Sequence, residues 1–226
     1  MDLVKKNNLN FFVGVDEVGR GSWAGPIVAC SCWINPTDFN KLPKDINDSK
    51  KLTEKKRKEI YHKIRDKCLT GVSLSTSKEI ESYGLIESNN LAILRSLFSL
   101  LECIKSKHKN SFFPEFIIYV DGNIVPNFDT FSKKVKTHLS LPSCQINSII
   151  KGDQKVVSIS LASIIAKVTR DFIMKNYDKK YPGYNFLKNY GYGTEQHRKS
   201  LEELGICNIH RKNYKPISTI FSYKNI

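Results

Sequence analysis

Three apolar, β-prone runs in this chain each lead into an acidic side chain close to a glycine. Short runs without polar interruptions are typical of strands that are covered on both faces of a sheet. In sheets flanked by helices, functional sites form at the carboxyl edge of the strands. We therefore expect four carboxylates to share one edge of a sheet. They are Asp16 and Glu17 after the first run, Asp121 after the second and Asp153 after the third.

The order of the predicted elements indicates an α/β fold. Two strands joined by a glycine-rich loop come first, and helices connect most of the later strands. An antiparallel start followed by helical crossovers predicts a five-stranded mixed sheet flanked by helices, and it excludes the all-α and all-β classes. The strands are expected at residues 11–15, 26–34, 71–77, 116–120 and 146–150, and the helices at residues 53–68, 91–104, 156–177 and 195–204.

The length of 226 residues favours one large domain over two independent ones. We expect the main α/β domain to cover residues 1–178. Residues 179–226 are expected to form a small helical C-terminal extension that packs on the same domain.

The charge of the chain is strongly positive. Lysine and arginine number 36 against 22 aspartates and glutamates, which gives a formal net charge of +14. An excess of this size points to a polyanionic partner, most often nucleic acid. A genome rich in A and T encodes Lys, Asn and Ile more often than average. Such a bias in base composition would produce the same excess of lysine without any nucleic-acid partner. The charge therefore indicates nucleic acid without excluding compositional bias.

Six cysteines are spread along the chain, and none are spaced as C-x-x-C. In a chain of this length they predict free thiols in a reducing compartment rather than a disulfide framework. The chain also shows no apolar run long enough for a signal peptide or a membrane span. We expect a cytoplasmic protein with no membrane partner.

The four carboxylates point to metal-dependent chemistry. Carboxylates that meet in space repel one another unless cations neutralise them, and sites built from oxygen ligands suit Mg²⁺ or Mn²⁺. Two such ions about 4 Å apart activate a water and stabilise the leaving oxygen in phosphodiester hydrolysis. An Asp beside a Gly is also ordinary turn chemistry. The recurrence at three strand ends favours the metal interpretation.

The loop after Glu17 places Arg20 between Gly19 and Gly21. Glycines let a ligand approach the backbone closely, so that its amides and carbonyls can contact a sugar or a phosphate. The tripeptide alone is weak evidence, but it becomes specific directly after an acidic pair.

The chain resembles the ribonuclease HII family over roughly residues 11–217. The motifs that carry the resemblance follow the order found in that family. They are DEVGRGSWAGP at 16–26, NDSK at 47–50, VDG at 120–122, KGD at 151–153, ASIIAKVTRD at 162–171, GYGT at 191–194 and IHR at 209–211.

The resemblance implies a ribonuclease H-like fold and the activity of a metal-dependent endoribonuclease. In the family, the acids that match Asp16, Glu17, Asp121 and Asp153 are catalytic and hold two Mg²⁺ or Mn²⁺ ions. The substrates are RNA/DNA hybrids and duplex DNA that contains ribonucleotides, which implies a role in ribonucleotide excision repair and DNA replication. Cutting occurs on the 5′ side of a ribonucleotide and leaves 5′-phosphate and 3′-hydroxyl ends. A monomer is expected.

The resemblance also implies the substrate contacts. The residues that match Gly19, Arg20 and Gly21 read the ribose 2′-OH, the group that distinguishes RNA from DNA at one nucleotide. The tyrosine that matches Tyr192 stacks on the next sugar, and the lysine that matches Lys50 contacts a phosphate.

Several differences separate the related types and mark this chain. Ribonuclease HIII usually carries Lys in place of Arg20 and adds an N-terminal domain, and archaeal ribonucleases HII often end in a clamp-binding peptide that residues 218–226 lack. The bacterial type of ribonuclease HII fits better.

This chain departs from the family at Tyr190, where lysine is common, at residues 160–162, where three alanines are usual, and at residues 205–208, which replace a run containing proline.

Two other functions stay open at this point. One is a DNA-cutting nuclease or recombinase of similar fold, against which the Gly-Arg-Gly loop argues. The other is a non-catalytic nucleic-acid-binding module, in which four acids facing the phosphates would weaken binding by repulsion.

Three other residues are candidates for catalysis. A structural role is the simpler interpretation of His197 and His210, and no oxyanion-hole signal supports Ser163 as a nucleophile.

Overall fold

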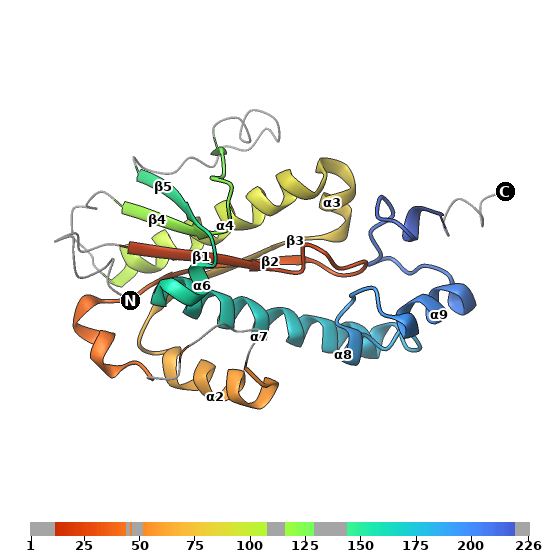
Figure 1. Cartoon of the computed structure of the whole chain (residues 1–226), viewed down its shortest axis with the longest axis horizontal. Helices are drawn as coiled ribbons and strands as arrows, with labels where there is room; N and C mark the ends of the chain where they lie inside the picture. Colours follow the sequence, from red (N-terminus) through yellow and green to blue (C-terminus); the bar gives the residue numbers. More distant parts are fainter. Residues whose placement is uncertain (1–11, 44–45, 47–51, 108–115, 129–143, 220–226) are drawn as a thin grey trace.

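The computed structural model describes residues 12–43, 46, 52–107, 116–128 and 144–219. These residues form a central sheet with helices on both faces (Figure 1). No helix within these ranges has the length and apolar character needed to cross a membrane.

The sheet has five strands in the order β3-β2-β1-β4-β5. The first three in sequence are antiparallel neighbours, whereas β4 runs parallel to β1 and β5 runs parallel to β4. This mixed sheet confirms the predicted α/β class. The strands are β1 Phe12–Val18, β2 Ile27–Trp33, β3 Leu69–Ser75, β4 Phe116–Asp121 and β5 Cys144–Ile149.

Strand β1 is longer than the sequence predicted. The apolar run was expected to end before Asp16, but the strand continues through Asp16 and Glu17 to Val18. The physical reason is its pairing with β2, in which Asp16 faces Cys30 and Val18 faces Val28. Backbone hydrogen bonds in a ladder do not depend on side-chain polarity, so the acids sit within the strand rather than in the loop after it.

Two long helices cover opposite faces of the sheet (Figure 1). Helix α4, Leu85–Lys107, packs on β2 and β3, and helix α7, Val157–Lys180, packs on β1 and β2. Helix α2, Glu54–Ile64, lies against α7 and begins at Thr53, whose side chain accepts a hydrogen bond from the Lys56 N–H. The sequence predicted Thr53 as the capping residue. The helix was expected to continue to residue 68, but it ends at Ile64.

Small residues allow α7 to approach the sheet closely. Ala162 and Ala166 are fully buried on the α7 side of the sheet. At Gly14 of β1 an added Cβ would lie only 2.3 Å from the backbone nitrogen of Ile159. Any side chain at Gly14 would therefore push α7 away from the strands that carry the acids.

Among the residues that the structure describes, four short helices were not predicted. They are the 3₁₀ helix η1 Pro36–Lys41, and the α-helices α3 Ser77–Tyr83, α6 Gly152–Lys155 and α8 Phe186–Asn189. Helix α3 begins where the third strand was expected to continue, because Thr76 and Glu79 form a reciprocal capping box that ends the strand pattern.

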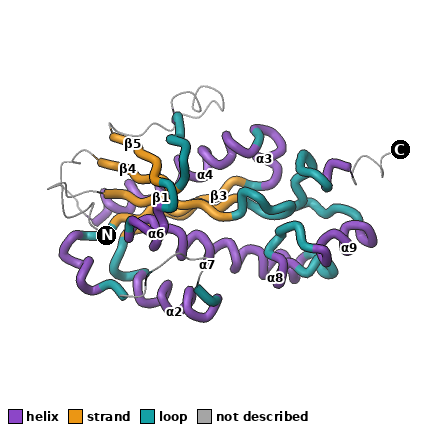
Figure 2. The backbone as a smooth tube through the Cα atoms, viewed as in Figure 1, coloured by secondary structure: helices purple, strands orange, loops and turns teal. Residues whose placement is uncertain are grey.

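Residues 181–219 gather at one end of the molecule, where α8 and α9, Glu195–Leu204, lie beyond the strands (Figure 2). A separate apolar cluster joins them to the β1–β2 loop; its buried members include Ala24, Met174, Phe186, Leu201 and Ile217. Helix α7 runs through the boundary expected at residue 178 and contributes Met174 to this cluster. The division into two parts stays a prediction.

Candidate active site

The strand register brings two of the predicted acids to the same sheet edge. Strands β1 and β4 are parallel, and Val15 pairs with Val120. The next residue on each strand is an acid, Asp16 on β1 and Asp121 on β4. Asp16 and Asp121 therefore lie side by side on neighbouring strands, one residue beyond the last paired residues of the ladder.

The segment after β5 turns back toward Asp121. Lys151 adopts a left-handed conformation with φ of 55°, after which Gly152 opens the one-turn helix α6. The Gly152 N–H donates a hydrogen bond of 2.7 Å to Asp121 Oδ1. This turn places Asp153, which is only 4% exposed, next to the residue that contacts Asp121.

Asp16 lies in an unfavourable electrostatic environment. Burial raises the pKa of Asp16 well above its usual value, and the charges of Glu17 and Asp121 raise it further. Hydrogen bonds from the Ser163 side chain and from the Glu17 N–H, the latter 2.7 Å long, act in the opposite direction. A charged Asp16 is therefore costly unless a cation lies nearby.

The acids share an edge without forming a compact cluster. Over the described ranges, no group of three or more His, Cys, Asp or Glu side chains is gathered as a metal centre. Glu17 Oε1 instead pairs with Arg20 Nη1 at 3.2 Å, and the Arg20 side chain is half exposed. The oxygen donors and the mutual repulsion at Asp16 nevertheless suit a hard divalent cation.

The loop between β1 and β2 is fastened by Arg211, a fully buried side chain from the C-terminal segment. Its guanidinium donates to the carbonyls of Gly19 at 2.7 Å and Arg20 at 2.8 Å, and to the carbonyl of Gly25 at 2.9 and 3.1 Å. Arginine carries five donors in a wide planar fork that can reach carbonyls of three different residues, whereas the compact ammonium of lysine has three donors on one atom. The backbone that follows the acidic pair is therefore held in one conformation.

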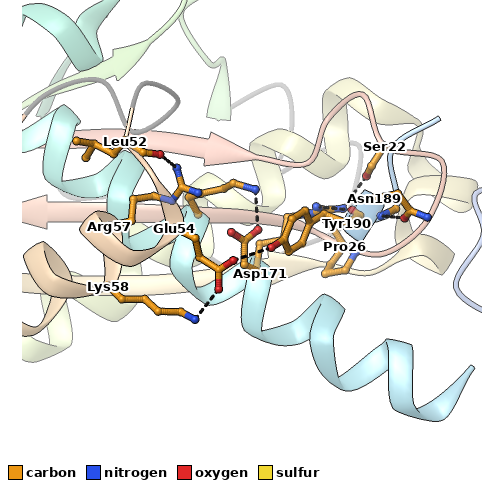
Figure 3. A network of polar contacts seen from close by, with 12 residues as sticks. Ser22, Pro26, Leu52, Glu54, Arg57, Lys58, Asp171, Asn189 and Tyr190 are labelled. Atoms are coloured by element: carbon orange, nitrogen blue, oxygen red, sulfur yellow. Dashed lines mark hydrogen bonds and ion pairs between the residues drawn. The ribbon is translucent and has the colours of Figure 1, made fainter. Parts of the chain in front are cut away.

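Arg170 of α7, also fully buried, holds the same loop from the other side. It donates to the Pro26 carbonyl at 2.9 Å, to Ser22 Oγ at 2.8 Å and to the Tyr190 carbonyl at 2.9 Å. Figure 3 shows Tyr190 between Ser22 and Pro26 on one side and α2 on the other. Arg170 thus links the loop, α7 and the tyrosine segment.

Neither arginine was assigned a role from the sequence, where both stood only within family-like motifs. The carbonyls that they bind lie far away along the chain, so their partners could not be identified from local pattern. The available signal was the position of Arg170 four residues after Ala166 and four before Met174, on one apolar face of α7, because an arginine buried on such a face must find acceptors.

The two glycines of the Gly-Arg-Gly loop differ in their surroundings. Gly19 has φ of +96°, and a Cβ there would lie 2.2 Å from Arg170 Nε. A Cβ at Gly21 would meet no atom within 4 Å. The fold therefore requires glycine at position 19, because of its backbone conformation and its contact with Arg170. The space beside Gly21 is open to a ligand.

Tyr192 lies beside this loop. The Arg170 guanidinium sits 5.3 Å from the centre of its ring. The preceding residue, Gly191, accepts hydrogen bonds from Trp23 N at 2.8 Å and Ala24 N at 3.1 Å, which joins the tyrosine segment to the β1–β2 loop. The structure thus brings Tyr192 and the Gly-Arg-Gly loop together. Lys50 lies outside the described residues.

Tyr190, the departure from the family pattern, bridges two elements. Its hydroxyl hydrogen-bonds Glu54 of α2 at 3.2 Å, and Lys167 Nζ lies 4.4 Å from the centre of its ring (Figure 3). Burial is the main cause that raises the pKa of Tyr190 to about 12, and the nearby Asp171 and Glu54 add to the shift. A neutral aromatic ring therefore fills the position where a lysine was expected.

His197 and His210 face each other inside the C-terminal cluster. Both are buried, and their Nε2 atoms are 3.1 Å apart. The Cys207 N–H donates to His210 Nδ1, and His197 Nδ1 lies 2.9 Å from the Tyr192 carbonyl. Burial lowers the pKa of both rings, that of His210 to about 4. These contacts favour a structural role over general-base catalysis.

The family model and the most similar sequences point to the same family. The model of the family described as Ribonuclease HII matches residues 13–217. Ribonuclease HII of Clostridium beijerinckii is 42% identical over 209 residues, which are 90% of this chain and 67% of that protein. Ribonuclease HII of Clostridium perfringens strain 13 is 40% identical over 205 residues, 90% of this chain and 66% of that protein. The matched region therefore spans about two thirds of these relatives.

A solved structure has the same fold. The crystal structure of ribonuclease H2 from Pyrococcus horikoshii superposes with a TM-score of 0.72 at 27% identity, covering 95% of this chain and 98% of that one. The predicted five-stranded fold flanked by helices is therefore that of a known nuclease architecture.

Proposed function

Because the chain belongs to the ribonuclease HII family of metal-dependent endoribonucleases, we propose that it hydrolyses the RNA strand of RNA/DNA hybrids. This membership confirms the bacterial-type family predicted from the sequence. We further propose that it incises duplex DNA on the 5′ side of single embedded ribonucleotides and leaves 5′-phosphate and 3′-hydroxyl ends.

The observation that carries the proposal is the fixed backbone of the Gly-Arg-Gly loop next to the acidic edge. Arg211 bonds the carbonyls of Gly19 and Arg20, and Arg170 bonds the Pro26 carbonyl farther along the same β1–β2 connection. The space at Gly21 is open. A preorganised backbone can contact one hydroxyl of a ligand without first losing its own freedom. In this proposal the Gly19–Gly21 backbone contacts the ribose 2′-OH, and the half-exposed Arg20 side chain lies at the rim of the site.

Asp16, Glu17, Asp121 and Asp153 are proposed to be catalytic and to hold two Mg²⁺ or Mn²⁺ ions. The support for this is the chemistry of the donor set and the raised pKa of Asp16, whose causes are burial and the neighbouring acids. When bound, two such ions supply an activated water and stabilise the leaving oxygen. The Gly152 N–H orients Asp121 by bonding one of its oxygens, which leaves the other available.

Tyr192 and Lys50 complete the proposed substrate contacts. Tyr192 is proposed to press on the sugar that follows the ribonucleotide, supported by its attachment to the β1–β2 loop through Gly191. Lys50 is proposed to contact a substrate phosphate, as its match in the family does. Together with the loop, they would fix the scissile phosphate against the acids.

We propose that the protein acts as a monomer in the cytoplasm. All six cysteines are free, and Cys30, Cys32 and Cys68 are buried, as expected of thiols in a reducing compartment.

The test is incubation with a DNA duplex that carries one ribonucleotide, with and without Mg²⁺ or Mn²⁺. The wild-type protein should cut once, on the 5′ side of the ribonucleotide, only when the ion is present. Asp16→Asn should cut at least ~100-fold more slowly, because it loses a negatively charged ligand. Since charged Asp16 is unfavourable in the protein alone, this variant should unfold without divalent ions at the same or a higher temperature than wild type.

Each alternative function predicts a different result. Cutting of an all-DNA duplex with equal efficiency would favour a DNA nuclease of similar fold. Binding of the duplex without cutting under any ion would favour a non-catalytic module. Near wild-type cutting by Asp16→Asn would contradict the assignment of the carboxylates.

A further inference from the structure

A hollow of about 250 Å³ adjoins the acidic edge. Glu17 and Asp121 line it, together with the first turns of α4 and the segment 122–127 that follows β4. Tyr192, which packs on Arg170 of α7, does not line it. The hollow therefore extends the proposed reaction centre toward α4 and away from Tyr192.

The lining of this hollow is rich in side-chain amides, and we call it the amide hollow. It has more acidic than basic side chains, and Arg20, the basic one, is paired with Glu17. Without bound metal ions these acids disfavour an anion, whereas the side-chain amides can form hydrogen bonds with an uncharged group. Exposed apolar side chains at Ile86 and Ile124 flank it. The amides are those of Asn89, Asn90, Asn123 and Asn127.

Asn89 is the most unusual of these residues. It is only 9% exposed, and within the described part of the chain its Oδ1 is buried with no hydrogen-bond partner. It lies on the same face of α4 as Ile86, Asn90 and Ile93, at helical spacing, and this face lines the hollow. A buried carbonyl oxygen without a donor costs stability, and alanine would avoid that cost.

The side chain can present either end of its amide to the hollow. The terminal torsion of asparagine is broad and roughly two-fold, so a half-turn exchanges the oxygen and the nitrogen. Because Oδ1 is buried in this structure, a ligand in the hollow would reach it only after such a half-turn, and the ligand's own donor would then satisfy the carbonyl oxygen.

We propose that the amide hollow is a subsite for an uncharged sugar or base edge of the hybrid duplex, with Asn89 as its recognition residue. This inference rests on the proposed function, because it takes the acids beside the hollow to hold the scissile phosphate. In the grooves of a duplex, sugar hydroxyls and base edges offer the donors and acceptors that amides can pair with. The exposed isoleucines provide apolar surface for the sugar.

The test compares Asn89→Ala with Ser88→Ala. Ser88 is the neighbouring residue on α4, is fully buried and also has an unpaired side-chain oxygen, but it does not line the hollow. Affinity for a fluorescent RNA/DNA hybrid is measured by anisotropy without divalent ions at several salt concentrations. Thermal unfolding and the kcat and KM of cleavage are measured on the same variants.

We expect Asn89→Ala to weaken hybrid binding and to lower kcat/KM by about tenfold, the effect of one lost hydrogen-bonding contact. Its unfolding temperature should equal or exceed that of wild type, and the salt dependence of binding should keep its slope, since no phosphate contact is lost. Ser88→Ala should bind and cut like wild type.

Two results would overturn the subsite. Wild-type affinity combined with a lower unfolding temperature would make Asn89 a structural residue. Weaker binding with a shallower salt dependence would mean that the hollow takes a phosphate. The binding comparison does not require cleavage, so a wild-type protein that bound hybrid without cutting would contradict the proposed function alone.

Discussion

Gly19 and Gly21 stand in one tripeptide, yet different things require them. The conformation and the close contact of Gly19 with Arg170 are properties of the folded chain itself. Gly21 has neither a positive φ nor a neighbour within reach of a Cβ. From the sequence the two glycines were equivalent, because nothing in the tripeptide shows which one faces a buried arginine.

This difference predicts opposite consequences for one chemical change. Gly19→Ala should destabilise the protein by about 1–3 kcal/mol or more, through backbone strain and the clash with Arg170. Gly21→Ala should leave stability within about 0.5 kcal/mol of wild type but reduce cutting at a single ribonucleotide by ~10-fold, because the methyl group occupies space proposed for the sugar. Urea unfolding and single-turnover cleavage measure the two effects. Full activity of Gly21→Ala would contradict the reading of the 2′-OH at this loop.

At the scale of elements, the buried arginines join parts of the chain that no helix or strand connects. Arg211 comes from the segment after α9 and bonds the carbonyl of Gly19, 192 residues earlier. Arg170 joins α7 to the same loop and to the Tyr190 segment. The segment after α9 therefore contributes directly to the conformation of the loop beside the acids.

Replacement of Arg211 tests this connection. Arg211→Lys keeps the charge but leaves some of the buried carbonyls without a donor, so it should cost about 2–4 kcal/mol of stability. At a temperature where the variant is folded, cutting should fall more than hybrid binding, because the proposed reading loop is loosened. The control is Arg198→Lys on α9, an exposed arginine 3.6 Å from Glu202, which should change stability by less than about 0.5 kcal/mol. An equal loss of binding and cutting in Arg211→Lys would assign the arginine to general stability.

Elements with strong local signals were predicted well from the sequence. Helix α9 was expected at residues 195–204 and spans Glu195–Leu204, because Thr194 caps its first turn and Gly205 follows its last residue. The carboxylates were assigned to one sheet edge from the strand ends alone. The length of β1, the one-turn helix at Gly152 and the partners of Arg170 depend on contacts between distant segments, so no local pattern could reveal them.

Across the whole molecule, the stability of the C-terminal end depends on two uncharged rings. His197 and His210 face each other among Tyr184, Phe186 and Trp23. Protonation of either ring would place a charge in this apolar cluster, next to a second imidazole. The pair also contacts the Tyr192 carbonyl, which connects the packing of the extension to the proposed sugar contact.

The histidine pair predicts how stability depends on pH. The pKa of His210 falls to about 4 in the folded protein, with burial as the main cause and His197 as the second, whereas an unfolded histidine titrates near about 6.5. Between these values the unfolded chain binds a proton that the folded chain does not. The free energy of unfolding should therefore be fully maintained above about pH 6.5 and should fall by up to about 3 kcal/mol as the pH drops toward 4. Asp16 acts in the opposite direction, because its raised pKa makes the folded protein take up a proton more readily as the pH falls.

Urea unfolding at several pH values is measured in the Asp16→Asn background, which removes the opposing contribution of Asp16, and the histidine contribution is the difference between His210→Asn and this parent. His210→Asn keeps a short polar side chain in place of the ring and should be less stable at pH 7, but its free energy of unfolding should change less between pH 6.5 and pH 4. His62→Asn, a change at an exposed histidine of α2, is the matched control and should keep the full pH dependence. If His210→Asn retained the same slope as the parent, the loss of stability in acid would have to arise from other groups. The buried pair would then be a packing contact without a role in the pH response.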